Sequence, residues 1–190
     1  MKFENINEII LSLLLWITSN TDYGDISVNP KVQFLVQSEL AELACNRPCE
    51  IIAYTPKDSK EKIYLSKNNN PTEDVCDRGV LLHELIHIYQ NNENAYADYE
   101  EKTRKHMMEM EALVLQNRYL STFGKKILYS RGFAGKFKNR GKDDLYCWFI
   151  ILLNEDLPIH PVKTSPLITN AGLPLKFSFF DKRINLFKIF

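Results

Sequence analysis

The sequence predicts a single domain of the α+β class, in which a small three-stranded sheet packs against two long helices. Three features lead to this prediction: short β-rich segments in the first half of the chain, one helical segment that is apolar nearly all round, and a second long helical segment after it. The chain has 190 residues, of which 45% are hydrophobic, and this suffices for one sizeable core. We therefore expect one domain over residues 1–190.

The first predicted element is a helix over residues 4–18. Its apolar run, residues 9–17, has the length of the hydrophobic segment of a signal peptide. Glu4 and Glu8 precede that run, however, and no small-residue cleavage site follows it. We therefore expect an amphipathic or buried helix of the folded domain.

A strand, a short helix and a hairpin are expected next. Residues 31–37 alternate in the manner of a strand, and residues 38–44 can form a short helix that begins at Ser38. Residues 50–54 and 62–65 have the composition of two short strands, and the polar segment between them has the length of a hairpin connection. These three strands form the predicted sheet.

Two long helices follow in the prediction. The segment Asn68-Asn69-Asn70-Pro71 breaks the chain, and Thr72 or Asp74 can cap the helix behind it. A polar stretch separates this helix from a second one over about residues 99–123, which Gly124 ends.

The C-terminal part has weaker patterns. Residues 130–144 are rich in Gly, Lys and Arg and are expected to form a loop, whereas the apolar residues 145–153 predict a core helix or strand. With Phe133 and Phe137 interleaved, the basic residues can bind phosphate or an acidic protein surface, but a solvated loop is the expected structure. These basic residues are Arg131, Lys136, Lys138, Arg140 and Lys142.

The first long helix contains the motif His83-Glu84-Leu85-Ile86-His87, an HExxH sequence. Residues four apart lie on the same face of an α-helix, so His83 and His87 can bind one metal ion. Glu84 lies beside them and can accept a proton from a water that the metal acidifies. The apolar neighbours predict a buried helix, where unpaired His and Glu side chains would be costly. The motif therefore predicts a Zn²⁺ site with Glu84 as general base.

HExxH supplies two ligands, whereas catalytic zinc usually has three protein ligands and one open position. The second long helix offers His106, Glu109 and Glu111. At Glu109-Met110-Glu111-Ala112 the chain resembles the gluzincin zinc peptidases, whose third ligand is a glutamate on a later helix, often in an E-x-x-A setting. The resemblance implies Glu109 as the third ligand, with Glu111 as second choice and His106 as third. The small Ala112 would let the two helices approach closely.

The resemblance covers about residues 30–125 and implies a zincin-like fold, with residues 126–190 as an extension of unknown role. The order of strand, short helix, hairpin, HExxH helix and glutamate helix is similar to that of compact minimal gluzincins. A weaker likeness is to bacterial metallopeptidase effectors and toxin domains. Related enzymes bind substrate as a strand added to the sheet edge, and residues 62–65 are the strand nearest the motif. This implies a protein or peptide substrate bound in extended form.

The expected function is that of a zinc-dependent endopeptidase, with His83, His87 and Glu109 as metal ligands and Glu84 as catalytic base. Candidates for stabilising the oxyanion are Tyr119, Tyr129 and His160. The alternative is a non-catalytic zinc-binding module that regulates or binds another protein on the same scaffold. Glu84 favours the enzyme, because a structural zinc site has four protein ligands and no use for a general base.

Composition narrows the class of partner and the compartment. The chain has 24 basic and 24 acidic residues, which gives no general case for a nucleic acid or an anionic membrane as partner. No segment approaches the roughly 20 apolar residues that a membrane helix needs. We expect a soluble protein that acts in the bacterial cytoplasm or is secreted into a host cell as an effector.

The four cysteines are expected to be reduced thiols, because a chain of this size does not need disulfides for stability. Cys45 and Cys49 can in principle begin a second metal site. No partner pair of Cys or His follows them at a suitable spacing, so we do not expect one.

Overall fold

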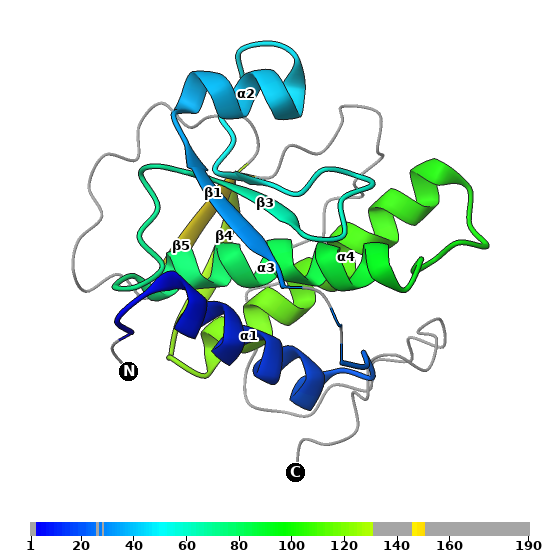
Figure 1. The fold of residues 1–190 in the computed structure, drawn as a ribbon, viewed down its shortest axis with the longest axis horizontal. Coiled ribbons are helices and arrows are strands. Elements are labelled where there is room, and N and C mark those ends of the chain that lie inside the picture. Colours follow the sequence, from blue (N-terminus) through cyan, green and yellow to red (C-terminus); the bar gives the residue numbers. More distant parts are fainter. Residues whose placement is uncertain (1–2, 26, 28, 131–145, 151–190) are drawn as a thin grey trace, which may run out of the picture.

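The computed structural model describes residues 3–25, 27, 29–130 and 146–150 (Figure 1). Over these residues the chain is of the α+β class, with a three-stranded sheet and a separate pair of strands, which confirms the predicted class and the predicted sheet. The elements are α1 (Ile6–Asn20), β1 (Lys31–Leu35), α2 (Gln37–Cys45), β2 (Ala53–Tyr54), β3 (Lys62–Ser66), α3 (Val75–Asn92), α4 (Glu101–Ser121), β4 (Lys126–Ser130) and β5 (Tyr146–Ile150).

The three-stranded sheet has the order β1-β3-β2. β1 runs parallel to β3, with Lys31 opposite Lys62, and β2 runs antiparallel to β3, with Tyr54 opposite Tyr64. The predicted hairpin between β2 and β3 is therefore confirmed. The expectation that residues 62–65 offer a sheet edge to the substrate is wrong, because β3 has a neighbour on both sides. The edge strand beside α3 is β2.

Helix α1 is amphipathic, as predicted. The side chain of Asn5 caps its first turn by accepting the backbone N–H groups of Asn7 and Glu8 at 3.0 and 3.1 Å. Its buried side chains recur at helical spacing and join the common core, whereas Leu11 and Leu15 remain exposed. The buried residues are Ile9, Ile10, Leu13 and Ile17. In Figure 1, α1 lies on the side of α3 away from the three-stranded sheet.

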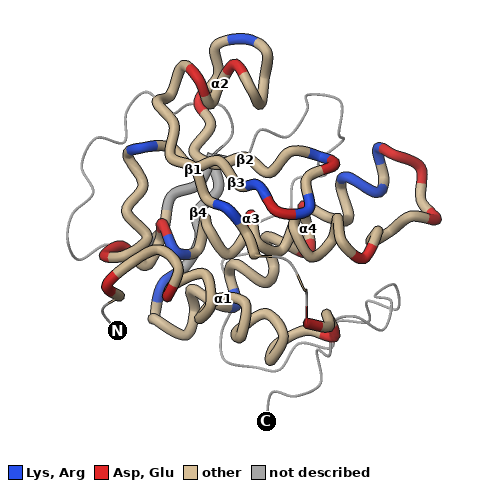
Figure 2. Tube along the Cα trace, viewed as in Figure 1, with Lys and Arg blue, Asp and Glu red and all other residues tan. Residues whose placement is uncertain are grey.

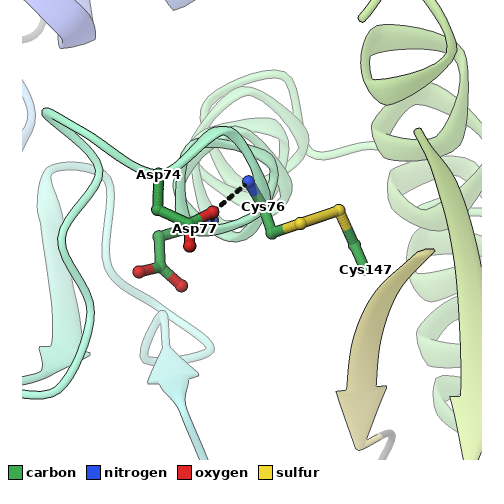
Figure 3. The surroundings of a disulfide bond; sticks show 4 residues. All are labelled: Asp74, Cys76, Asp77 and Cys147. Atoms are coloured by element: carbon green, nitrogen blue, oxygen red, sulfur yellow. Dashed lines mark hydrogen bonds between the residues drawn. A yellow bond between two sulfur atoms is a disulfide. The ribbon is translucent and has the colours of Figure 1, made fainter. Parts of the chain in front are cut away.

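Helix α3 is buried on nearly all sides, because the sheet, α1 and α4 pack around it. Of the two predicted caps, Asp74 caps this helix: its Oδ1 accepts the N–H of Cys76 at 2.7 Å (Figure 3). Gly79 allows α4 to approach closely, since a Cβ there would lie 2.9 Å from Leu120 Cδ2. The predicted end of the second long helix is also close, since α4 stops at Ser121 and Gly124 has a φ of +68°.

The strands β4 and β5 pair in parallel, with Ile127 opposite Cys147. β5 confirms the strand alternative for the apolar residues 145–153, and β4 was not predicted. The predicted loop with its basic residues falls almost wholly on residues 131–145, which lie outside the described residues, as does His160.

The expectation of reduced thiols is wrong, because all four cysteines form disulfides. Cys45 pairs with Cys49, four residues on, at the end of α2. Cys76, in the first turn of α3, pairs with Cys147 in β5, 71 residues later (Figure 3). Sequence spacing could not reveal the second pair, since only the fold brings the two strands and the start of α3 together.

Figure 2 shows Lys and Arg interspersed with Asp and Glu along the described chain. Among the described helices, none has both the length and the apolar character that crossing a membrane requires.

The disulfide between Cys76 and Cys147 should contribute more to stability than the one between Cys45 and Cys49. It closes a far longer loop, and the loss of such a bond typically costs about 2–4 kcal/mol. Cys147→Ser should therefore lower the midpoint of thermal unfolding clearly more than Cys49→Ser, measured by circular dichroism without reductant. Equal midpoints for the two variants would contradict this.

Candidate metal centre

The helix α3 presents both histidines of the motif on one face. His83 and His87 are one turn apart, and their Nε2 atoms lie 3.1 Å from each other. Their rings meet nearly at right angles, with centroids 4.7 Å apart and an interplanar angle of 85°. The two Nε2 lone pairs can therefore converge on a point between the rings.

Glu109 of α4 completes this group. Its Oε2 lies 3.3 Å from His83 Nε2 and its Oε1 lies 3.3 Å from His87 Nε2. Ligand atoms about 2.0–2.1 Å from a tetrahedral zinc are about 3.3–3.4 Å apart, and each histidine Nε2 lies at about this distance from the other Nε2 and from one of the two carboxylate oxygens of Glu109. In the described part of the chain, His83, His87 and Glu109 form the group of ligand atoms close enough together to hold a metal ion.

The site is open on the side of Glu109. The side chains of His83 and His87 are 14% and 12% exposed, whereas that of Glu109 is 37% exposed. A metal held by these three side chains would keep a position accessible from solvent, which is typical of catalytic sites.

The electrostatics of the group favour a bound cation. Burial opposes the charged form of His87, but the carboxylate of Glu109 outweighs it and raises the pKa of His87 to about 9. Burial also favours the neutral form of Glu109, but His87 and His83 hold its pKa well below the usual range. Without a metal, the carboxylate of Glu109 therefore favours the uptake of a proton by the imidazole of His87. A metal cation and that proton compete for the same electron pairs.

A side-chain amide lies next to the Nδ1 atom of each of the two histidines. Gln116 Oε1 lies 3.2 Å from His83 Nδ1, and Gln90 Oε1 lies 2.7 Å from His87 Nδ1. Gln90 and Gln116 are buried, with 0% and 2% exposure. Partners of this kind orient metal-binding imidazoles and leave Nε2 toward the metal.

Glu111, the second choice for third ligand, lies elsewhere. It is 1% exposed, and its Oε2 accepts hydrogen bonds from Gln90 Nε2 at 2.9 Å and from the hydroxyl of Tyr23 at 2.7 Å. Its other oxygen, Oε1, is buried without a partner in the described structure. Glu111 therefore supports the residue behind His87, and the helix presents Glu109 to the histidines.

The residues behind the ligands were missed in the sequence analysis. Gln90 follows His87 by three residues, and this spacing alone could have suggested that it lies over the ring on the same face of α3. Gln116 and Tyr23 had no such signal, because they lie on α4 and on the segment after α1. Tyr23 also lies outside residues 30–125, the span to which the resemblance was assigned.

Glu84 lies next to the group of His83, His87 and Glu109 but is not one of its members. It is 7% exposed, and its charge acts on both His87 and Tyr54. Burial and then the charge of Glu84 raise the pKa of Tyr54 in the edge strand β2. The Thr55 hydroxyl donates to the backbone carbonyl of Glu84 at 3.3 Å, which ties the end of β2 to the motif.

The remaining candidates are not part of this group. His106 is not among the clustered ligand atoms, and its Nδ1 is buried with no hydrogen-bond partner in the described structure. Tyr119 packs edge-on against Trp16 and Phe123 in the core, with 6% exposure. Tyr129 lies in β4, and its role as an oxyanion donor stays a prediction.

The purified chain should bind about one zinc ion per molecule, measured by elemental analysis after dialysis. Glu109→Ala should weaken zinc binding by more than the roughly 10- to 100-fold that loss of a supporting residue behind a ligand typically costs. The matched control is Glu111→Gln, which keeps an oxygen for both of its donors and should retain the metal. If Glu111→Gln releases zinc and Glu109→Ala retains it, Glu109 is not the third ligand.

Comparison with known proteins gives one match. Neither a curated protein nor a solved structure matches the chain. One family model, described as a domain of unknown function (DUF6647), matches residues 2–128. This span includes α1 to α4 and with them the three clustered ligands and Glu84. The chain therefore belongs to the DUF6647 family.

Proposed function

We propose that this protein is a zinc-dependent endopeptidase with a zincin-like catalytic core. The observation that carries the proposal is the group of His83, His87 and Glu109, in which the two Nε2 atoms lie 3.1 Å apart and each lies 3.3 Å from one oxygen of the Glu109 carboxylate. Its dimensions suit tetrahedral zinc, and its ligand set of two imidazoles and one carboxylate is a common one for catalytic zinc.

The position of Glu84 supports catalysis over a purely structural site. A structural zinc site is closed by four protein ligands, whereas the described residues bring three together and leave the Glu109 side open. Within the described chain no hydrogen bond engages the carboxylate of Glu84. A buried carboxylate without a partner beside a metal site is well placed to take up and release a proton.

The proposed roles of the residues follow from this arrangement. Zinc, when bound by His83, His87 and Glu109, would supply Lewis-acid chemistry and lower the pKa of water. Glu84 accepts the proton of the attacking water and delivers it to the leaving amine. Gln90 and Gln116 hold the two imidazoles in orientation behind the site.

An extended peptide is the proposed substrate, and β2 is the strand to which it would add. β2 is at the edge of the sheet, and Thr55 at its end is hydrogen-bonded to the backbone of Glu84. A peptide paired with this edge would pass the open side of the site, with its main chain held by hydrogen bonds of the sheet type.

The disulfides support an action outside a reducing cytosol. Disulfides form and persist in oxidising compartments, and all four cysteines of this chain are paired. We therefore favour secretion over the bacterial cytoplasm, the other compartment expected from the sequence.

The change Glu84→Gln tests the proposed function. It should leave the fold and the zinc content unchanged but lower the cleavage rate by about 10²- to 10⁴-fold, because the general base is lost. The measurement is the appearance of new N-termini in a proteome-derived peptide library, for zinc-loaded wild type and variant. Glu42→Gln is the control, since it makes the same chemical change at an exposed position of α2 and should cleave as wild type does.

Two outcomes would contradict the proposal. One is cleavage by Glu84→Gln at the wild-type rate. The other is zinc-loaded wild type that cleaves no peptide and holds a protein partner as tightly as Glu84→Gln does, which would favour the non-catalytic binding module.

A further inference from the structure

Gln90 is a fully buried amide with three polar contacts, two of which run to oxygen atoms that accept hydrogen bonds. It lies on α3, three residues after His87, and is 0% exposed. Its Nε2 is 2.9 Å from the carbonyl oxygen of Met108 and 2.9 Å from Glu111 Oε2, both on α4. Its Oε1 is 2.7 Å from Nδ1 of His87.

These contacts allow one orientation of the amide. A carbonyl and a carboxylate oxygen can only accept hydrogen bonds, so the group facing Met108 and Glu111 must be the NH₂ of Gln90. Turning the amide over would set its oxygen against two acceptors at 2.9 Å in a buried place, where unmade hydrogen bonds cost most. The oxygen Oε1 is thereby forced toward His87.

The orientation of the amide in turn decides which of the two ring nitrogens carries the hydrogen when the imidazole of His87 is neutral. Because Oε1 is an acceptor, Nδ1 must be the donor, and Nε2 is left to offer its lone pair. Nε2 is the atom that lies 3.1 Å from His83 Nε2 and 3.3 Å from Glu109. A chain of donors and acceptors therefore runs from the segment after α1 to the metal site.

We propose that Gln90, held by Glu111 and Tyr23, is a positioning residue that fixes His87 as the Nδ1–H tautomer and so directs its Nε2 to the metal. The inference rests on the proposed metal site. It assigns to Glu111 a role as an acceptor that holds the amide. It also makes the N-terminal segment part of the site, since the Tyr23 hydroxyl donates to the oxygen of Glu111 that receives Gln90.

The test is a set of four variants whose zinc affinity is measured by competition with a chromophoric chelator. Gln90→Met keeps the length of the side chain and removes both hydrogen-bonding groups, so zinc affinity should fall about 10- to 100-fold. Gln90→Glu should lose at least as much, because it sets a second carboxylate against Glu111. Glu111→Gln should lose less affinity than Gln90→Met does, since its amide oxygen can still accept from Gln90 and Tyr23.

The fourth variant combines Gln90→Glu with Glu111→Gln and is a rescue. In it the carboxylate at position 90 can accept from His87 and from the new amide at position 111, whereas its contact with the carbonyl of Met108 stays unfavourable, so part of the affinity lost by Gln90→Glu should return. A residue needed only for packing would show no such rescue, because both single changes nearly preserve volume. Zinc affinity of Gln90→Met equal to that of wild type, or no rescue in the double variant, would overturn the proposal.

A second measurement does not depend on zinc or on the folding of a variant. In metal-free wild type with ¹⁵N-labelled histidine, at a pH where the ring is neutral, His87 should show a protonated Nδ1 and a bare Nε2. The reverse pattern would overturn the inference even if zinc binds. Wild type that shows the expected tautomer and binds zinc but cleaves nothing would instead count against the proposed function alone.

Discussion

The close packing of α4 along α3 is the contact on which the rest of the structure depends. Gly79 on α3 leaves room for Leu120 at a distance that a side chain would not permit, and Ala112 is fully buried farther along α4. Only this closeness brings a carboxylate on one helix within 3.3 Å of two imidazoles on the other. The same contact buries polar groups between the helices, and their hydrogen bonds then have to be made inside the protein.

Those buried polar groups explain why the site is organised before any metal binds. Gln90, Gln116 and Glu111 are at most 2% exposed, and each makes a hydrogen bond to a residue of another element or to a ligand. A satisfied network in a buried place holds its members in one arrangement, because an alternative would leave a donor or an acceptor unpaired. Such support reduces the reorganisation that metal binding would otherwise require.

Several parts of the chain outside α3 and α4 are bonded to residues at the ends or in the middle of these two helices. Asp74 caps the first turn of α3, and the disulfide from Cys76 to Cys147 links that turn to β5. In the segment after α1, the hydroxyl of Tyr23 donates a hydrogen bond to Glu111 of α4. The sheet contributes its edge strand β2, whose end is bonded to the backbone of Glu84. Elements distant in sequence therefore converge on α3 and on the residues of α4 that pack against it.

The sequence by itself determined the local features of this protein. The spacing of His83 and His87 placed two imidazoles on one face. The alternation of residues 31–37 and the composition of residues 50–54 and 62–65 predicted the three strands within a few residues of their ends. It also ranked Glu109 ahead of Glu111, although by resemblance to a motif. The sequence could not determine how segments distant along the chain lie relative to one another. β3 is the central strand because β1 pairs with the side of β3 that β2 leaves free, and Cys76 forms a disulfide with Cys147, 71 residues later. The roles of Gln90, Gln116 and Tyr23 were decided by tertiary structure alone, because a buried amide has a meaning only through the partners that other helices bring to it.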